Sequence, residues 1–316
     1  MSISKIIIPL GIGVFFIYLS YNNTSSEDRE NIFSHIKNAN YSFVFLSVVF
    51  GALSHISRAY RWKFLLAPLG YKPRLINSLL AVLIGYVSNL GIPRSGELFR
   101  ATVMDRFENI PFQKGFGTVI AERLVDLFIL LCFVSLALIL KFDLIWGILA
   151  NKPINPVHIS LIIVGVSIVF LILRKFINQS NNPFLKKIRL FFSELWEGII
   201  SLKKMEHKWA FVGHTLFIWL MYLAMFYIMK FSIPETASLG LESLIAAFVV
   251  GALAVSATNG GVGIYPFSVS LVLIAYGISK ESSLAFGWIM WTSQTVMIVL
   301  FGSLAFFALP LVNRIK

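Results

Sequence analysis

Two apolar stretches of this chain are interrupted near their centres by residues that break helices. The first interruption covers residues 88–97 and the second covers residues 258–266, and each combines asparagine, glycine and proline. In lipid, a broken backbone leaves N–H and C=O groups unpaired at a cost of several kcal/mol each, so breaks persist only where they are buried in protein or line a cavity. Paired breaks in the two halves of a membrane protein indicate a transport site.

The composition is that of an integral helical membrane protein. Hydrophobic residues make up 57% of the 316 residues and charged residues only 13%, whereas a soluble domain carries about 25% charged residues. The longest run without an apolar stretch, residues 174–208, is too short for a catalytic domain, which needs about 50 residues or more. We therefore expect a single membrane domain over residues 1–316.

Basic residues concentrate in a few segments between the apolar stretches. Lysine and arginine gather in 58–74, which holds five of them and no acidic residue, in 94–123, which holds five, and in 174–208, which holds eight. Since cytoplasmic loops carry the excess of lysine and arginine, these segments and both termini are expected in the cytoplasm. The apolar stretches themselves cover roughly residues 3–20, 41–66, 75–91, 124–140, 157–173, 209–230, 241–257, 263–277 and 281–309.

This distribution predicts two re-entrant hairpins. Residues 75–105 lie between two basic segments, so they are expected to enter the membrane from the cytoplasm and return. Residues 241–277 lie between two segments poor in basic residues and are expected to form a second hairpin that enters from outside. The alternative interpretation is two ordinary loops joined by marginally hydrophobic helices.

The two halves of the chain then contain the same elements. Residues 1–156 and residues 157–316 each comprise two spanning helices, a hairpin and a third spanning helix, which makes about six spanning helices in all. Three crossings per half invert the second half relative to the first, as in many transporters. The expected fold is an all-α integral membrane protein with an inverted repeat. Residues 174–208 combine basic residues with an apolar face and are predicted to be a cytoplasmic amphipathic linker.

The first break carries most of the polar chemistry. Pro93 favours the first turn of a helix, and a half-helix that begins there would present its free N–H groups to an anion at the hairpin tip. Arg94, Glu97 and Arg100 follow at intervals of three residues, near one helix face. An arginine fork suits phosphate oxygens. These three residues and the preceding Asn89 are predicted to hold a substrate headgroup.

More charged residues flank the apolar stretches on either side of the first hairpin. Glu122, Arg123 and Asp126 lie at the start of the stretch 124–140, where a membrane-embedded charge costs at least ~2.5–3.5 kcal/mol. They either bind substrate or form an internal salt bridge that fastens the hairpin to the next helix. Arg58 and Arg61 close the second apolar stretch, and they either anchor it at the cytoplasmic surface or line a headgroup pocket.

The second break contains no charged residue, so its polar groups are side-chain amides and hydroxyls together with exposed backbone. It is predicted to shape or gate a cavity rather than to bind charge. The residues assigned to this role in the two breaks are Gly91, Pro93, Asn259, Gly260, Gly261, Tyr265 and Pro266.

Taken together, these motifs resemble the lysylphosphatidylglycerol synthase transmembrane-region family, whose best-known member is the flippase half of the multiple peptide resistance factor. The resemblance covers roughly residues 5–310 and implies a lipid-handling protein with re-entrant helices around a lipid cavity. The bifunctional members also have a soluble aminoacyl-transferase domain, so lysinylation of a lipid is not expected of this polypeptide. The residues that carry the resemblance are Asn89, 93–97, Arg100, 122–126, 58–62 and 260–263.

The leading functional hypothesis is a lipid translocase of the cell (inner) membrane that moves an anionic or phosphate-bearing lipid, such as an isoprenoid phosphate. The alternatives are a membrane enzyme acting on a lipid phosphate or a prenyl-linked sugar, an accessory subunit of a lipid-modifying enzyme, and an ion-coupled transporter of small solutes. With Cys132 as the only cysteine and no ligand spacing among the histidines, no catalytic motif, metal or cofactor is expected.

Among partners, nucleic acid is not expected, because the basic residues of 174–208 lie beside an apolar face. The protein partners left open are a second copy of this chain and a lipid-modifying enzyme.

Overall fold

The computed structural model describes residues 26–92, 94–140, 193, 200–258 and 260–313, and the regular structure in these ranges is entirely helical. The expected all-α membrane protein is confirmed to that extent. The elements are α2 (Ser26–Lys37), α3 (Tyr41–Leu66), η1 (Ala67–Leu69), α4 (Leu75–Gly91), α5 (Gly96–Glu108), α6 (Phe112–Leu140), α10 (Lys208–Met229), η2 (Lys230–Ser232), η3 (Glu235–Ser238), α11 (Leu241–Ala257), α12 (Ile264–Ala275) and α13 (Lys280–Val312).

Within the described ranges, four helices are long and apolar enough to cross a membrane. They are α3 with η1, α6, α10 with η2, and α13. At a rise of about 1.5 Å per residue, the 33 residues of α13 extend over about 50 Å. The spanning helices predicted at 3–20 and 157–173, and most of the linker predicted at 174–208, lie outside the described residues.

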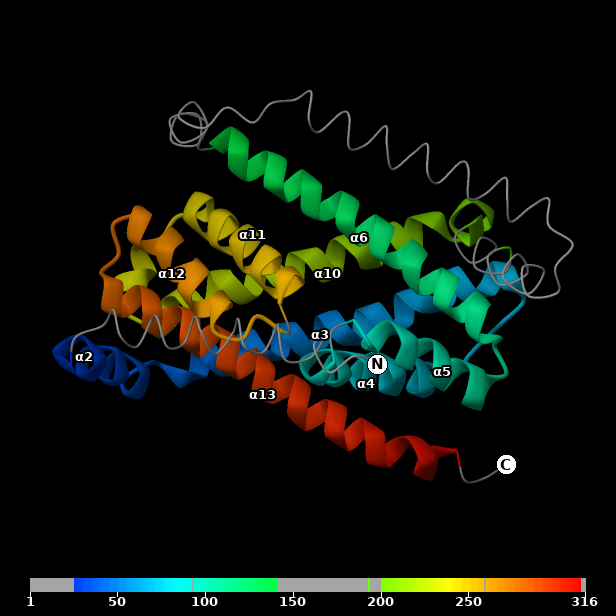
Figure 1. Ribbon diagram of the computed structural model, residues 1–316. Coiled ribbons are helices and arrows are strands. Elements are labelled where there is room, and N and C mark those ends of the chain that lie inside the picture. Colours follow the sequence, from blue (N-terminus) through cyan, green and yellow to red (C-terminus); the bar gives the residue numbers. More distant parts are fainter. Residues whose placement is uncertain (1–25, 93, 141–192, 194–199, 259, 314–316) are drawn as a thin grey trace, which may run out of the picture.

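The long helices begin and end at the same two ends of the bundle. α10 runs antiparallel to α3, because Ser47 contacts Met225 while Ser57 contacts His214. We call the end where α3 and α13 stop and where α4, α6 and α10 begin the basic end. There the Asn313 side chain, just after α13, donates to Asn77 Oδ1 at 2.9 Å. α11 and α13 begin at the opposite end (Figure 1).

Between the long helices lie two helical hairpins that point toward each other. α4 and α5 pack together and extend from the basic end, whereas α11 and α12 pack together and extend from the opposite end (Figure 1). The tips of the hairpins meet beside α13: a Cβ placed on Gly260 would lie only 2.4 Å from Leu90 Cδ2. The Trp291 indole N–H, about 17 Å along α13, donates to the Gly260 carbonyl at 2.7 Å.

A pair of glycines allows the two helices of the first hairpin to approach closely. A Cβ on Gly96 would lie 2.1 Å from the Gly85 carbonyl oxygen, well inside van der Waals contact. A Cβ on Gly85 would in turn lie 2.9 Å from Arg100 Cγ. The backbone contact therefore brings α5 against α4 and leaves room for the stem of Arg100 between them.

The buried apolar side chains form two cores with a polar layer between them. One core surrounds the first hairpin and includes Trp62 of α3 and Ala121 of α6. The other surrounds the second hairpin and includes Trp219 of α10, with Phe133 of α6 packed against it. Along α6, Glu122 and Asp126 lie between Ala121 of the first core and Ile129, which packs against the second. Charged groups buried at this level are thus enclosed by apolar packing on both sides.

Replacing Gly96 by alanine tests the close approach within the first hairpin. The added methyl group must displace the α4 backbone, so we expect Gly96→Ala to lower the free energy of unfolding by about 1–3 kcal/mol. The readout is the thermal unfolding midpoint of the protein in detergent. Gly213→Ala is the matched control, because a Cβ at Gly213 meets no atom within 4 Å. Equal midpoints for the two variants would contradict this packing.

Candidate functional site

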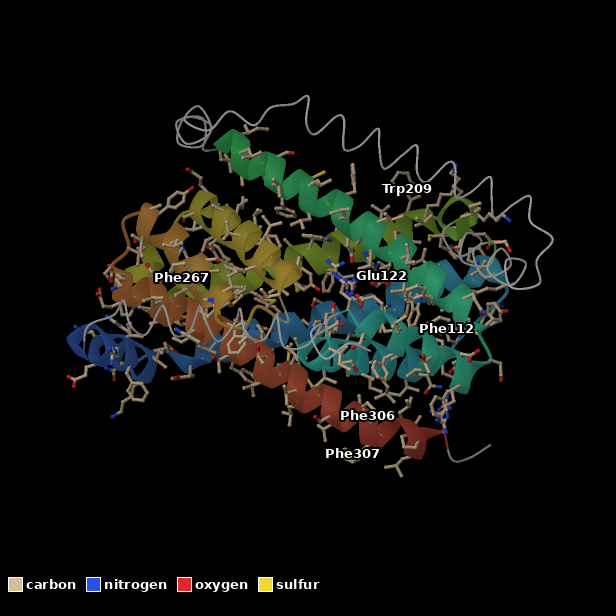
Figure 2. The ribbon with its side chains drawn as sticks, viewed as in Figure 1. Phe112, Glu122, Trp209, Phe267, Phe306 and Phe307 are labelled. Carbon is tan, nitrogen blue, oxygen red and sulfur yellow. The ribbon has the colours of Figure 1, made fainter. Side chains whose placement is uncertain are left out.

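Five buried charged residues join α3, α5 and α6, and we call them the buried charge cluster. They are Arg58, Arg61, Arg100, Glu122 and Asp126, and none has more than 8% of its surface exposed. Arg58 Nη1 donates to Glu122 Oε1 at 2.5 Å and to Asp126 Oδ2 at 2.6 Å. Figure 2 shows Glu122 near the middle of the molecule. Charge-assisted bonds of this length are the strong class of protein hydrogen bonds.

The other two arginines of the cluster complete its links between helices. Arg61 donates through Nη1 and Nη2 to Asp126 Oδ1, both at 3.0 Å. Arg100 forms a fork on Glu122, with distances of 3.2 and 3.0 Å to the two carboxylate oxygens. Its guanidinium lies over the Trp62 ring, 4.3 Å from the centroid. Glu122 therefore connects the first hairpin to both α3 and α6.

Two hydroxyl groups of α10 also contact the cluster, and the sequence analysis did not identify them. The Tyr222 hydroxyl accepts from Arg58 Nη2 at 3.3 Å, and Thr215 Oγ1 accepts from Arg61 Nη1 at 2.8 Å. Thr215 and Tyr222 are seven residues apart, so they lie on one face of an otherwise apolar helix. That spacing is the sequence signal that could have identified them.

The buried charge cluster is not neutral. Three arginines face two carboxylates, so one positive charge has no partner inside the cluster. In the described part of the chain, the buried Nε atoms of Arg58, Arg61 and Arg100 also have no hydrogen-bond partner. Burying an unpaired charge or donor is costly. The arrangement is thus suited to accept an additional anion.

Arg94 occupies the tip of the first hairpin in an unusual conformation. Its φ is +57°, a left-handed geometry that costs a non-glycine residue about 1–2 kcal/mol. Its side chain is exposed, and among the described residues it has no ion pair. A strained residue with a free guanidinium, near the contact between the two tips, is a candidate ligand for a passing anion.

The start of α5 differs from the sequence-based expectation. The helix begins at Gly96 rather than near Pro93, and Pro93 lies outside the described residues. The Asn89 side-chain oxygen accepts from the Gly96 N–H at 2.7 Å, and the Ser95 hydroxyl donates to the Ser88 carbonyl at 3.1 Å. Asn89 therefore pairs one of the backbone donors that the break leaves open.

Glu97 and Arg123 form a second, more accessible ion pair between α5 and α6. Arg123 Nη2 lies 3.1 Å from Glu97 Oε1, and 38% and 21% of the two side chains are exposed. Arg94, Glu97 and Arg100, predicted to share one helix face, thus have three different environments. Arg94 is free at the tip, Glu97 pairs with Arg123, and Arg100 is buried against Glu122.

The second tip is built from glycines and aromatic residues. Gly260 and Gly261 have φ values of +65° and +77°, which glycine adopts without penalty. The Tyr265 ring is buried against Gly251 of α11, where a Cβ would lie 2.7 Å from it. Pro266 packs in the same way against Gly287 of α13. Of the other predicted gating residues, Gly91 is exposed at the end of α4, and Asn259 lies outside the described residues.

Replacing Glu122 by glutamine tests whether the buried charge cluster supports the fold. The change leaves three buried arginines facing one carboxylate, so we expect unfolding to become easier by roughly 3–5 kcal/mol. The measurement is the thermal midpoint of the purified protein. Glu97→Gln is the control, because a partly exposed pair contributes only about 0–1 kcal/mol.

A double variant separates charge from packing at the same position. Arg100→Gln combined with Glu122→Gln restores the wild-type excess of one positive charge in the cluster. We therefore expect the double variant to lose less stability than the sum of the two single variants, as coupled neighbours do. Additive losses would indicate that the two side chains do not interact.

The amino-acid sequence is similar to those of known proteins. A family model described as lysylphosphatidylglycerol synthase TM region matches residues 6–302. The chain is 25% identical to UPF0104 membrane protein MJ1595 of Methanocaldococcus jannaschii over 230 residues, which are 64% of this chain and 67% of that protein. It is 31% identical to Glycosyltransferase AglD of Haloferax volcanii over 101 residues, or 32% of this chain and 16% of AglD. The chain thus matches only a small part of AglD.

Proposed function

We propose, because this chain belongs to the lysylphosphatidylglycerol synthase transmembrane-region family, that it moves an anionic or phosphate-bearing lipid between the leaflets of the cell membrane. The observation that carries this proposal is the excess of arginine at the first hairpin, which is shared between the buried charge cluster and the exposed Arg94 of the hairpin tip. Guanidinium groups bind phosphate oxygens well, and charges at membrane depth usually mark a substrate pathway.

The proposed topology places the basic end in the cytoplasm. The described residues place more lysine and arginine at this end than at the other, a bias that follows the rule for cytoplasmic loops. The basic end carries Lys63, Lys72, Arg74, Arg106, Lys114, Lys203, Lys204 and Lys208, and the opposite end carries Arg29, Lys37, Lys230 and Lys280. In this orientation α4–α5 and α11–α12 are re-entrant hairpins that enter from opposite faces. Both termini are then cytoplasmic, and the two halves form an inverted repeat.

The headgroup is proposed to pass along the surface between α5 and α6. The Glu97–Arg123 pair lies on this surface. Directly beside it, α6 presents Leu124, Leu127 and Phe128, each at least half exposed, as expected of a lipid-facing helix. A lipid can therefore keep its chains against α6 while its headgroup exchanges contacts with Arg123 and Arg94.

Translocation by the purified protein in liposomes tests this function. Wild-type protein is expected to accelerate the movement of fluorescent anionic lipids between leaflets, as measured by dithionite quenching. Arg94→Gln is expected to reduce the rate at least tenfold with an unchanged thermal midpoint, because the substitution removes a free cation and no packing contact. Arg106→Gln is the matched control, since Arg106 is an exposed arginine near the end of α5, the helix that follows Arg94, and lies at the basic end. Exchange at the protein-free rate for every lipid tried would refute the proposal.

Cysteine labelling tests the proposed topology independently. In a Cys132→Ala background, Lys72→Cys and Arg106→Cys flank the first hairpin and should be labelled from the same side of the membrane by an impermeant maleimide. Ser238→Cys should be labelled from the other side. All three positions are exposed. Labelling of positions 72 and 106 from opposite sides would mean that the first hairpin crosses the membrane.

The similarity to AglD supports a second candidate function. That relative is named a glycosyltransferase, and the shared 101 residues would then be a part that holds a lipid phosphate or a prenyl-linked sugar. On this alternative, the chain acts on such a lipid or serves a lipid-modifying enzyme as an accessory subunit. Sugar transfer to or from a prenyl phosphate by the purified protein, without movement of lipid between leaflets, would favour this function.

A further inference from the structure

The charge balance at the level of the two tips identifies the class of headgroup. Building on the proposed function, we infer that the transported lipid carries at least two negative charges on phosphate oxygens, as a fully ionised phosphomonoester or diphosphate does, rather than the single charge of a phosphodiester. Two observations support this inference: the charged residues that the structure describes at this level, and how deeply each of them is buried.

In the described part of the chain, five arginines and three carboxylates lie between the two ends of the bundle. They are Arg58, Arg61, Arg94, Arg100, Arg123, Glu97, Glu122 and Asp126, and they leave an excess of two positive charges. The charged residues of α10, α11 and α13 lie at the helix ends instead. Residues 6–20 and 157–173, two apolar stretches outside the described residues, contain no lysine, arginine, aspartate or glutamate, so they add no charge to this balance.

The two surplus charges lie at different depths. One belongs to the buried charge cluster, in which three arginines face two carboxylates and the Nε donors lack partners in the described part of the chain. The other is Arg94, which is exposed at the tip. Between them, Arg123 and Glu97 balance each other. An anion on this surface thus meets a free cation first and an under-compensated cluster behind it.

The free-energy cost of the uncompensated positive charges favours some headgroups over others. In a low-dielectric region an uncompensated charge is expensive, and an opposite charge nearby removes much of that cost. A phosphodiester cancels one of the two surplus charges, whereas a phosphomonoester dianion or a diphosphate cancels both. A lysylated phosphodiester carries a net positive charge, which is the wrong sign for this site. The lipid named in the family description is therefore not the one that this charge balance favours.

Binding of short-chain lipids to the full-length protein in detergent tests this inference. The probes are dihexanoyl phosphatidic acid, dihexanoyl phosphatidylglycerol, farnesyl diphosphate and a short-chain lysylphosphatidylglycerol, and the readout is the ligand-dependent rise of the thermal midpoint. At pH 8 we expect phosphatidic acid to bind about tenfold or more tightly than phosphatidylglycerol, since one additional charge near the cluster contributes at least about 1.4 kcal/mol, which is tenfold in affinity. Farnesyl diphosphate, with about three negative charges at pH 8, should bind at least as tightly as phosphatidic acid.

The pH dependence provides an internal control. The second proton of a phosphomonoester dissociates at a pKa of about 6, so binding of phosphatidic acid should strengthen as the pH rises from 5 to 8. Binding of phosphatidylglycerol should change little, because its phosphodiester does not titrate there. A parallel change for both lipids would assign the effect to the protein and would overturn this inference. The titratable side chains that face the cluster and the tip are His55, Tyr86, Tyr222, Glu97, Glu122 and Asp126.

Binding and translocation measurements together distinguish a failure of this inference from a failure of the proposed function. Arg94→Gln should reduce the preference for the dianion, and Arg106→Gln should preserve it. Equal binding of phosphatidic acid and phosphatidylglycerol at pH 8, or tighter binding of lysylphosphatidylglycerol, overturns the inference even if the protein translocates lipids. Selective binding of dianions without movement between leaflets supports the headgroup assignment and contradicts the translocase.

Discussion

The bonds that Arg58, Arg61 and Arg100 make to Glu122 and Asp126 are the interaction on which the arrangement of helices depends. Taking such charges out of water costs several kcal/mol for each ion, and the cost is offset only where geometry and hydrogen bonding are good. Here the bonds to Glu122 join α3, α5 and α6 through one carboxylate. The two apolar cores on either side exclude water from these contacts. The cluster thereby fixes the depth at which the first hairpin sits.

A second constraint is that each break leaves backbone N–H and C=O groups without helical partners. The two tips provide hydrogen-bond partners for these groups in different ways. At the first tip, Asn89 and Ser95 pair the backbone groups that the broken helix exposes. At the second tip, Trp291 of α13 donates to the Gly260 carbonyl. The first tip is thus satisfied by its own residues and the second by a neighbouring helix. This matches the sequence, because polar side chains cluster at the first break and glycines at the second.

The sequence predicted the long helices and the short, paired helices well, because these depend on local hydrophobicity and on glycine and proline. It also indicated Glu122, Asp126 and the arginines, because charges inside apolar stretches are rare. It did not indicate which carboxylate each arginine binds, since Arg58 and Glu122 are 64 residues apart. The roles of Thr215 and Tyr222 were missed for the same reason. The later start of α5 follows from Asn89 accepting from Gly96 and from Arg94 adopting a left-handed conformation, neither of which hydrophobicity encodes.

The contact between Leu90 and Gly260 has a mechanical consequence. It joins a leucine side chain to glycine backbone, and dispersive contacts of this kind contribute only about 0.1–0.2 kcal/mol per atom pair. Both hairpins pack against α13 through glycines: Val87 of α4 lies against Gly302, and Pro266 of α12 lies against Gly287. Because both hairpins rest on the same helix, the tips can separate only if one hairpin slides along α13 or if α13 bends between Gly287 and Gly302. Either movement breaks the weak contact between Leu90 and Gly260 and leaves the bonds inside each hairpin in place.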